Sequence, residues 1–187
     1  MMTPDSTNTE RAIPARSDAG RVRLLDPDRL LSDWKVLAAR HHHLHAPEAA
    51  KLMDVPEAAL TAARIGTGAT RLKADMAAIL APLPEWGRVL CAGSNACGVH
   101  MPLGRTDIGR HGDALLLTAA HMRAMIDHGA VQDAYLFVNS DENHGNSRSL
   151  QFFDSAGNTV LKVFIFHKTR FEEAERYLLT LKSPDQS

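Results

Sequence analysis

Arg148-Ser149-Leu150-Gln151-Phe152-Phe153-Asp154-Ser155-Ala156-Gly157-Asn158 is the most informative stretch of this chain. Residues 148–153 are rich in apolar and aromatic side chains, as a strand requires, and 154–158 hold the Asp, Ser, Gly and Asn that form turns. A second run of β-branched and aromatic residues follows at 159–166. Together they predict a β-hairpin that closes an antiparallel sheet.

The rest of the second half has the same character. Short apolar runs predict strands at 88–92, 96–101, 114–118 and 134–138. We expect a Gly-containing loop at 104–112, a short helix or loop at 122–128 and a polar loop at 139–147. An amphipathic pattern at 169–181 predicts a closing helix.

The first half reads as helices. Asp26-Pro27-Asp28 is a helix start, and apolar residues recur at helical spacing up to Arg40. Pro47 and Pro56 mark two more helix starts, and 75–80 suggests a fourth helix. Helices first and antiparallel strands afterwards predict an α+β fold: N-terminal helices, then antiparallel sheet, then a C-terminal helix.

Composition indicates one ordinary globular domain. The chain has 187 residues, 44% of them hydrophobic, with 21 basic and 22 acidic residues for a net charge of −1. We expect a single domain at 23–182, a disordered polar tail at 1–22 and a short tail at 183–187. The near-neutral charge argues against a nucleic-acid partner.

The chain shows no sign of export or membrane insertion. It has two cysteines, Cys91 and Cys97, which do not suggest a disulfide framework. The polar N-terminus lacks the apolar segment of a secretory signal, and nowhere do about 18 apolar residues follow one another. We therefore expect a cytoplasmic protein without membrane insertion.

Two segments of the first half allow a functional and a plain interpretation. His41, His42, His43 and His45 form a cluster that could bind a divalent metal, since imidazole is a common ligand, or could be a solvated loop between helices. Residues 48–60 resemble a helix-turn-helix. However, its second helix is mostly alanine with one arginine, Arg64, which favours a packed helical hairpin over a DNA reader.

The second half contains a further candidate site. His100 lies in a predicted strand, and Gly98 on the same face would leave room for a flat ligand, although a lone strand histidine is often structural. Arg105 and Arg110 follow in the predicted loop and could bind carboxylates. Gln151 and Phe153 share one face of the 148–153 strand. The chain has no G-x-S-x-G, H-E-x-x-H, P-loop or G-x-G-x-x-G motif.

Four segments, taken in order, resemble one module of the bacterial haem-utilisation family, the HemS/ChuX-like haemin-degrading and haem-trafficking proteins. They are residues 48–72, residues 90–104 with Val99-His100, the Ser149-to-Gly157 segment, and residues 161–163. The segment that begins at Ser149 is the most specific of the four. Together they lie within residues 30–181.

The resemblance implies a HemS/ChuX-like fold, a cytoplasmic location, haem as ligand and pairing as a homodimer. It implies that His100 is the iron ligand, that Arg105 and Arg110 meet the propionates, and that Gln151 and Phe153 line the pocket. His111, His121 and His128 are replacement candidates for the ligand. The implied function is haem uptake, transfer between unidentified donor and acceptor proteins, or storage, with haem degradation possible.

Two other functions stay open. The chain could be a haem-free regulatory or scaffold module of the same fold. It could also be a divalent-metal-binding protein that uses the histidines at 41–45.

Overall fold

The computed structural model describes residues 13–16, 22–41, 44–95, 98–100, 103–119, 122–141, 145–165 and 168–184. The chain divides into two compact units, residues 1–65 and 66–187. The sequence predicts one domain over 23–182, and that prediction stays open. None of the described helices has the length and apolar content needed to cross a bilayer.

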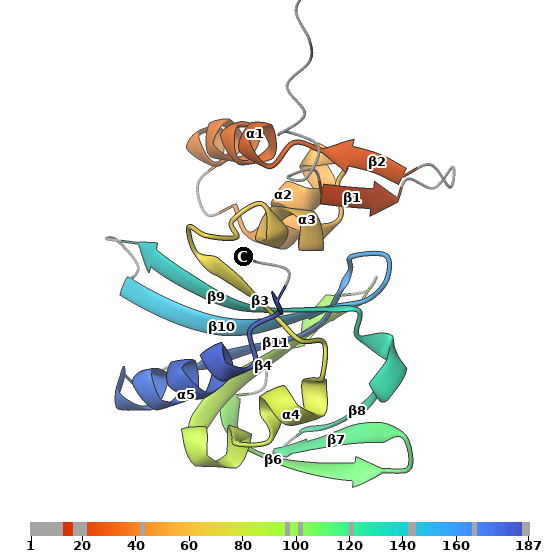
Figure 1. Cartoon of the computed structure of the whole chain (residues 1–187), viewed down its shortest axis with the longest axis vertical. Coiled ribbons are helices and arrows are strands. Elements are labelled where there is room, and N and C mark those ends of the chain that lie inside the picture. The colour runs from red at the N-terminus through yellow and green to blue at the C-terminus, as the bar shows by residue number, and fades with distance from the viewer. Residues whose placement is uncertain are drawn as a thin grey trace, which may run out of the picture. The chain divides into compact units, whose positions relative to one another are not determined.

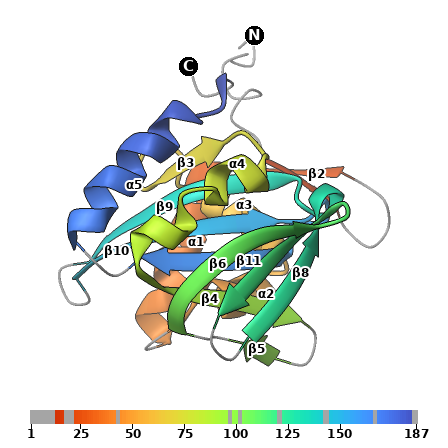
Figure 2. The ribbon, with the colours of Figure 1, turned by 90° about the horizontal axis from the view of Figure 1, so that it is seen from below.

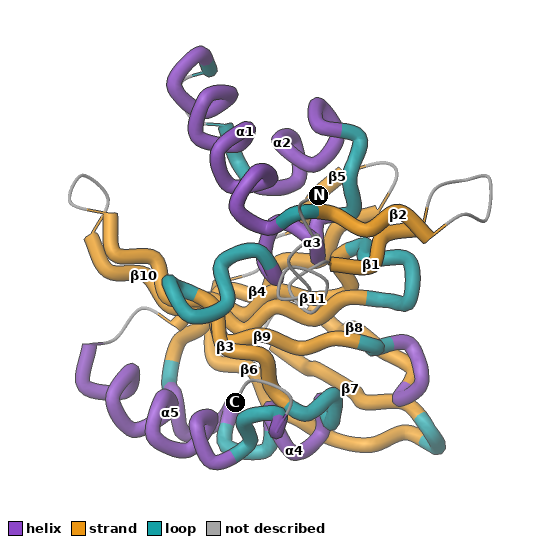
Figure 3. The backbone as a smooth tube through the Cα atoms, turned by 45° about the horizontal axis from the view of Figure 1, so that its top comes forward, coloured by secondary structure: helices purple, strands orange, loops and turns teal. Residues whose placement is uncertain are grey.

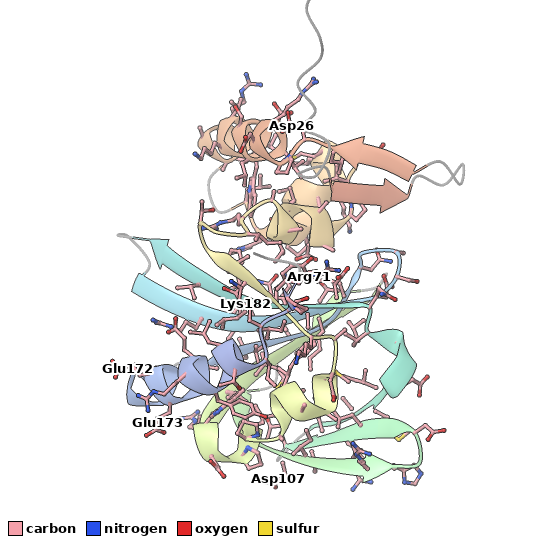
Figure 4. All side chains as sticks on the ribbon, in the orientation of Figure 1. Asp26, Arg71, Asp107, Glu172, Glu173 and Lys182 are labelled. Atoms are coloured by element: carbon pink, nitrogen blue, oxygen red, sulfur yellow. The ribbon has the colours of Figure 1, made fainter. Side chains whose placement is uncertain are left out.

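The first unit is small and mainly helical (Figure 1). Its elements are β1 (Ile13–Arg16), β2 (Val22–Leu25), α1 (Pro27–Arg40), α2 (Ala46–Met53) and α3 (Glu57–Ala62). Asp26 caps α1, since its carboxylate accepts hydrogen bonds from the backbone N–H groups of Asp28 and Arg29 (Figure 4). The three helices share one apolar cluster: Leu25, Leu30, Ala49, Ala50, Ala59, Leu60 and Ala63.

The second unit is a large antiparallel sheet with helices on one face (Figures 1 and 2). In the described residues the sheet has nine strands, in the order β3-β9-β10-β11-β4-β6-β7-β8, with β5 paired to β4. The strands are β3 (Ala69–Leu72), β4 (Arg88–Asn95), β5 (Gly98–His100), β6 (Leu103–His111), β7 (Ala114–Ala119), β8 (Met122–Asp127), β9 (Asp133–Asp141), β10 (Gly145–Phe153) and β11 (Thr159–Ile165). The helices are α4 (Met76–Leu80), α5 (Lys168–Thr180) and the 3-10 helices η2 (Leu83–Trp86) and η3 (His128–Ala130).

The core of this unit lies between the sheet and α4, η2 and α5. Alternate residues of β10 and β11, Leu150, Phe152, Leu161 and Val163, point into it and are at most 4% exposed. Ile79 and Leu178 meet them from α4 and α5. The hydroxyl of Tyr177 also donates to the carbonyl of Ala78 at 2.8 Å, which links the two helices.

The predicted α+β fold is confirmed, and most elements lie where the sequence places them. The hairpin predicted from residues 148–166 is β10–β11, in the middle of the sheet (Figure 3). Its turn is held by Asp154, whose Oδ1 accepts from the N–H groups of Ala156 at 2.8 Å and Asn158 at 2.9 Å. Gly157 adopts the left-handed conformation that completes the turn, with φ at 81°.

Several local predictions are wrong. The expected loop at 104–112 is strand β6, and the expected helix or loop at 122–128 is strand β8 followed by η3. The strands β9 and β10 continue into the polar segment 139–147. Polar and Gly-rich residues form strands here because neighbouring strands satisfy their backbone groups, a tertiary effect that propensity does not report. Strand β1 likewise lies inside the predicted disordered tail, and β3 was not predicted.

Candidate functional site

His100 lies in β5, on a hairpin whose other arm is β4. It pairs directly with Gly93. Further along the same hairpin, Arg88 pairs with Arg105 and Leu90 with Leu103. These three pairs follow one continuous antiparallel register. Strands β5 and β6 therefore pair with successive parts of β4. The side chain of His100 is outside the described residues.

The glycine opposite His100 leaves space in the sheet. A Cβ atom built on Gly93 would have no described atom within 4 Å, apart from its chain neighbours. Directly opposite side chains in an antiparallel pair normally approach to about 4.5–5.5 Å and pack against each other. The His100 position therefore faces a partner with no side chain, which is the kind of gap that a flat ligand could fill.

The two predicted arginines lie at different distances along the strand that follows. Arg105 is five residues beyond His100 and Arg110 is ten, which correspond to about 16 Å and about 33 Å of extended strand. Arg110 is exposed and pairs with Leu115 near the β6–β7 turn. The side chain of Arg105 is outside the described residues. Arg105 pairs with Arg88, five residues from Gly93 on β4, so a regular β4 places Arg105 on the face opposite His100.

Gln151 and Phe153 lie on the central strand β10 and are both buried, at 6% and 0% exposed. The Gln151 amide donates from Nε2 to Oγ of Ser149 at 3.2 Å. The ring of Phe153 meets that of Tyr135 edge-on, with 5.9 Å between centroids and 67° between planes. These residues share the sheet face opposite the α4 and α5 core.

A row of polar side chains crosses the sheet on this face. Arg71, Tyr135, Gln151 and Lys162 are successive cross-strand neighbours on β3, β9, β10 and β11. Arg71 forms an ion pair with Asp133. Burial raises the pKa of Tyr135 to about 12; Asp133 acts in the same direction and Arg71 opposes it. Sequence reasoning missed Tyr135 and the ion pair, although polar residues at every second position of β10 signalled a second polar face.

The predicted site residues fall on two adjacent rows of the sheet. The row of Gln151 runs through Lys162 to Ala92, while His100 pairs with the next residue, Gly93. Consecutive strand residues alternate between faces, so a regular β4 places these two rows on opposite faces. The structure thus brings Gln151 and Phe153 together, and it places His100 with the β4 hairpin.

The described parts of the two candidate sites of the first half lie in and at the ends of its helices. His41 is the exposed C-cap of α1, and His45 precedes α2, where its N–H donates to Oε2 of Glu48 at 3.1 Å. His42 and His43 lie outside the described residues, and the described residues contain no group of three or more metal-ligating side chains. Helix α3 is largely buried, which agrees with the packed-hairpin interpretation.

The other histidines named as possible ligands are scattered. His111 is exposed at the end of β6, and His128 lies in η3 with its side chain outside the described residues. His121 lies outside the described residues altogether.

The part of the chain that forms most of this sheet and its helices matches a family of haem-utilisation proteins. Residues 54–181 match the family described as the haemin-degrading HemS.ChuX domain. The chain is also 33% identical over 152 residues to the hemin transport protein HmuS of Yersinia pestis, covering 79% of this chain and 43% of that protein. It is 34% identical over 130 residues to the hemin transport protein HemS of Yersinia enterocolitica, covering 67% of this chain and 36% of that protein.

A solved structure agrees with this match. The crystal structure of holo-PhuS, a heme-binding protein from Pseudomonas aeruginosa, superposes with a TM-score of 0.76 at 29% identity, covering 87% of this chain and 48% of PhuS. The chain therefore belongs to the HemS/ChuX domain family, as its sequence resemblance implied. It spans less than half the length of these relatives.

Proposed function

We propose that this protein binds haem in the cytoplasm and serves haem uptake, intracellular transfer or storage. The observation that carries the proposal is the family match over residues 54–181, a segment that contains all five predicted site residues. The named relatives are hemin transport proteins and a heme-binding protein. Haem donor and acceptor proteins for this chain belong to the same proposal.

The β4 hairpin supports His100 as the axial ligand. Haem would supply an iron that accepts an imidazole nitrogen, and it needs a flat space beside that imidazole. The missing side chain at Gly93 provides open space opposite the His100 position. A histidine opposite a bulky residue would lack this space.

Two arginines are proposed to bind the haem propionates. Haem propionates are carboxylates, which guanidinium groups bind in bidentate fashion. Arg105 is about 16 Å of strand from His100, whereas Arg110 is about 33 Å away and exposed. We propose that Arg105 and Arg110 both contact the propionates. The resemblance also proposes Gln151 and Phe153 for the pocket wall, although a regular β4 places their row on the face opposite the row of His100.

A haemin titration of the purified apo-protein, followed in the Soret region, tests the proposal. We expect a saturable shift with one haem per chain, lost or strongly weakened in His100→Ala and retained in His111→Ala, the matched control at an exposed position at the end of β6. Arg105→Ala and Arg110→Ala should each weaken haemin binding. An unchanged titration in His100→Ala would move the ligand to another histidine. If the wild-type protein shows no saturable shift, the haem-free scaffold function becomes the favoured hypothesis.

Oxidative haem degradation is a second candidate, favoured by the description of the family as haemin-degrading. Ascorbate added to the haem-loaded protein in air would test it. Loss of the Soret band with release of carbon monoxide would support turnover. A stable, reduced haem spectrum would support transfer or storage without turnover.

Assembly as a homodimer completes the proposal. The family resemblance implies such pairing, and light scattering of the purified chain would test it.

A further inference from the structure

Two arginines occupy directly opposed positions where β4 pairs with β6. Arg88 of β4 is the register partner of Arg105 of β6. Directly opposite residues of an antiparallel pair have Cβ atoms about 4.5–5.5 Å apart, and like charges at such positions destabilise a sheet. An anion bound at both guanidinium groups would remove this repulsion. The register therefore indicates an anion site at these two positions.

Arg88 has no carboxylate partner within the part of the chain that the structure describes. Its side chain is exposed, and none of the described ion pairs includes it. Glu85 and Asp107 are the acidic residues nearest in the chain to the two arginines. Both are exposed, and the described ion pairs include neither of them. Arg88 is thus available to an anionic ligand.

The two arginine positions border an apolar row on the same face of the sheet. Two residues further along β4, Leu90 pairs with Leu103 of β6 and with Phe164 of β11. Leu90 and Phe164 are half-buried, so part of their apolar surface is accessible. The neighbouring residues Val89 and Ile165 belong to the core beneath α4 and α5, and side chains alternate along a strand. The apolar row therefore lies on the face opposite that core.

An arginine pair beside an apolar row suits a ligand with an apolar body and a carboxylate. Guanidinium groups bind carboxylates in bidentate fashion. Haem is such a ligand, because its flat ring is apolar and its propionates are carboxylates. The row of Gln151 and Lys162 lies on the same face, on the other side of Leu90 and Phe164.

We infer that Arg88 and Arg105 form one carboxylate site that takes a haem propionate, which makes Arg88 a further haem-binding residue. The inference rests on the proposed function and adds to it a second guanidinium group for the same propionate. It does not depend on which histidine holds the iron.

Haemin and haemin dimethyl ester, whose esterified propionates carry no charge, are the two probes for a test. We expect Arg88→Ala to weaken haemin binding about tenfold or more, because hydrogen bonds between charged groups contribute at this level. The same variant should bind the dimethyl ester as the wild type does. Arg88→Lys keeps the charge and loses the planar fork, so its affinity for haemin should lie between those of Arg88→Ala and the wild type.

The double variant R88A/R105A tests whether both arginines share one carboxylate. Two groups that bind one partner are not independent, so the combined loss of affinity should be smaller than the product of the two single losses. A combined loss equal to that product would overturn the shared site. Arg176→Ala, at an exposed position of α5, is the control and should leave both titrations unchanged.

The apo-protein gives a readout that needs no haem. Arg88→Ala removes one of two like charges, so without ligand it should unfold at the same urea concentration as the wild type or a higher one. A lower unfolding midpoint would assign Arg88 a structural role and overturn the inference. With haemin present the wild type should be the more stable of the two, because a ligand stabilises the protein that binds it more tightly.

The outcomes separate this inference from the proposed function. A wild type that binds neither probe would overturn the proposed function and this inference with it. A wild type that binds haemin no more tightly than Arg88→Ala does would overturn the inference alone. Equal losses for haemin and its dimethyl ester would also overturn it, because Arg88 would then act without a carboxylate.

Discussion

The Arg148 guanidinium donates from Nε to Oε2 of Glu175 at 2.8 Å, and this ion pair ties β10 to helix α5. Both side chains are partly buried, at 21% and 30% exposed. The pair therefore anchors the helix that covers the core face of the central hairpin.

Removing Glu175 should loosen this anchor. We expect Glu175→Ala to lower the free energy of unfolding by about 1 kcal/mol, since charge-assisted bonds outside full burial contribute at this level. Urea denaturation would measure it. Glu172→Ala is the matched control, because Glu172 is exposed on the same helix (Figure 4) and should change stability little. Equal effects of the two variants would contradict the anchoring role.

Phe153 should be important for stability as well as for the proposed pocket. It is fully buried against Tyr135, so Phe153→Ala should cost about 3–5 kcal/mol, and Phe153→Leu less than about 1.5 kcal/mol. Thermal and denaturant unfolding would measure both. If Phe153 also lines the haem pocket, the well-folded Phe153→Leu variant should bind haemin more weakly than wild type. Unchanged haemin affinity would leave Phe153 a core residue only.

The raised pKa of Tyr135 predicts a stability change at high pH. The folded-state pKa is about 12, above the usual value of 10, so between these values the unfolded chain binds fewer protons than the folded one. Stability should therefore be unaffected below pH 10 and fall as the pH rises from 10 towards 12. Tyrosinate absorbance and denaturation at several pH values would show it. The Tyr135→Phe variant should lose the tyrosinate absorbance that appears near pH 12. Its free energy of unfolding should also decrease less between pH 10 and 12 than that of the wild type.

The turn of the β10–β11 hairpin should depend on Asp154. Its carboxylate accepts hydrogen bonds from two backbone N–H groups and, at 3.2 Å, from the side-chain amide of Asn158. Asp154→Ala removes the acceptor of all three hydrogen bonds. We expect a loss of about 1–2 kcal/mol. Ser155→Ala, in the same exposed turn, is the control and should change stability by less than about 0.5 kcal/mol. Similar losses in both variants would assign the effect to the turn in general.

Local patterns were sufficient for much of the fold. Three prolines located three helices: Pro27 and Pro47 lie in the first turns of α1 and α2, where proline fits, and Pro56 is the N-cap of α3. The alternation and turn residues of 148–166 located the central hairpin, since side-chain period and turn chemistry are local properties. The resemblance of these same segments also identified the family.

The remaining strands depended on their neighbours. Strand β6 contains Gly104, Gly109 and several charged residues, and it is a strand because β4 and β7 pair with it. The polar row through Tyr135 and Gln151 likewise joins residues from strands far apart in sequence. Such contacts arise only when the chain is folded, because cross-strand pairing depends on register and not on local propensity.

The sequence by itself therefore determined the class of fold, the central hairpin and the haem-utilisation family, all of which follow from short-range patterns. Only the tertiary structure decided that His100 pairs with Gly93 and that Gln151 belongs to the adjacent row. Strand order and register decide these relationships, and both result from the long-range pairing of backbone groups that each strand must satisfy.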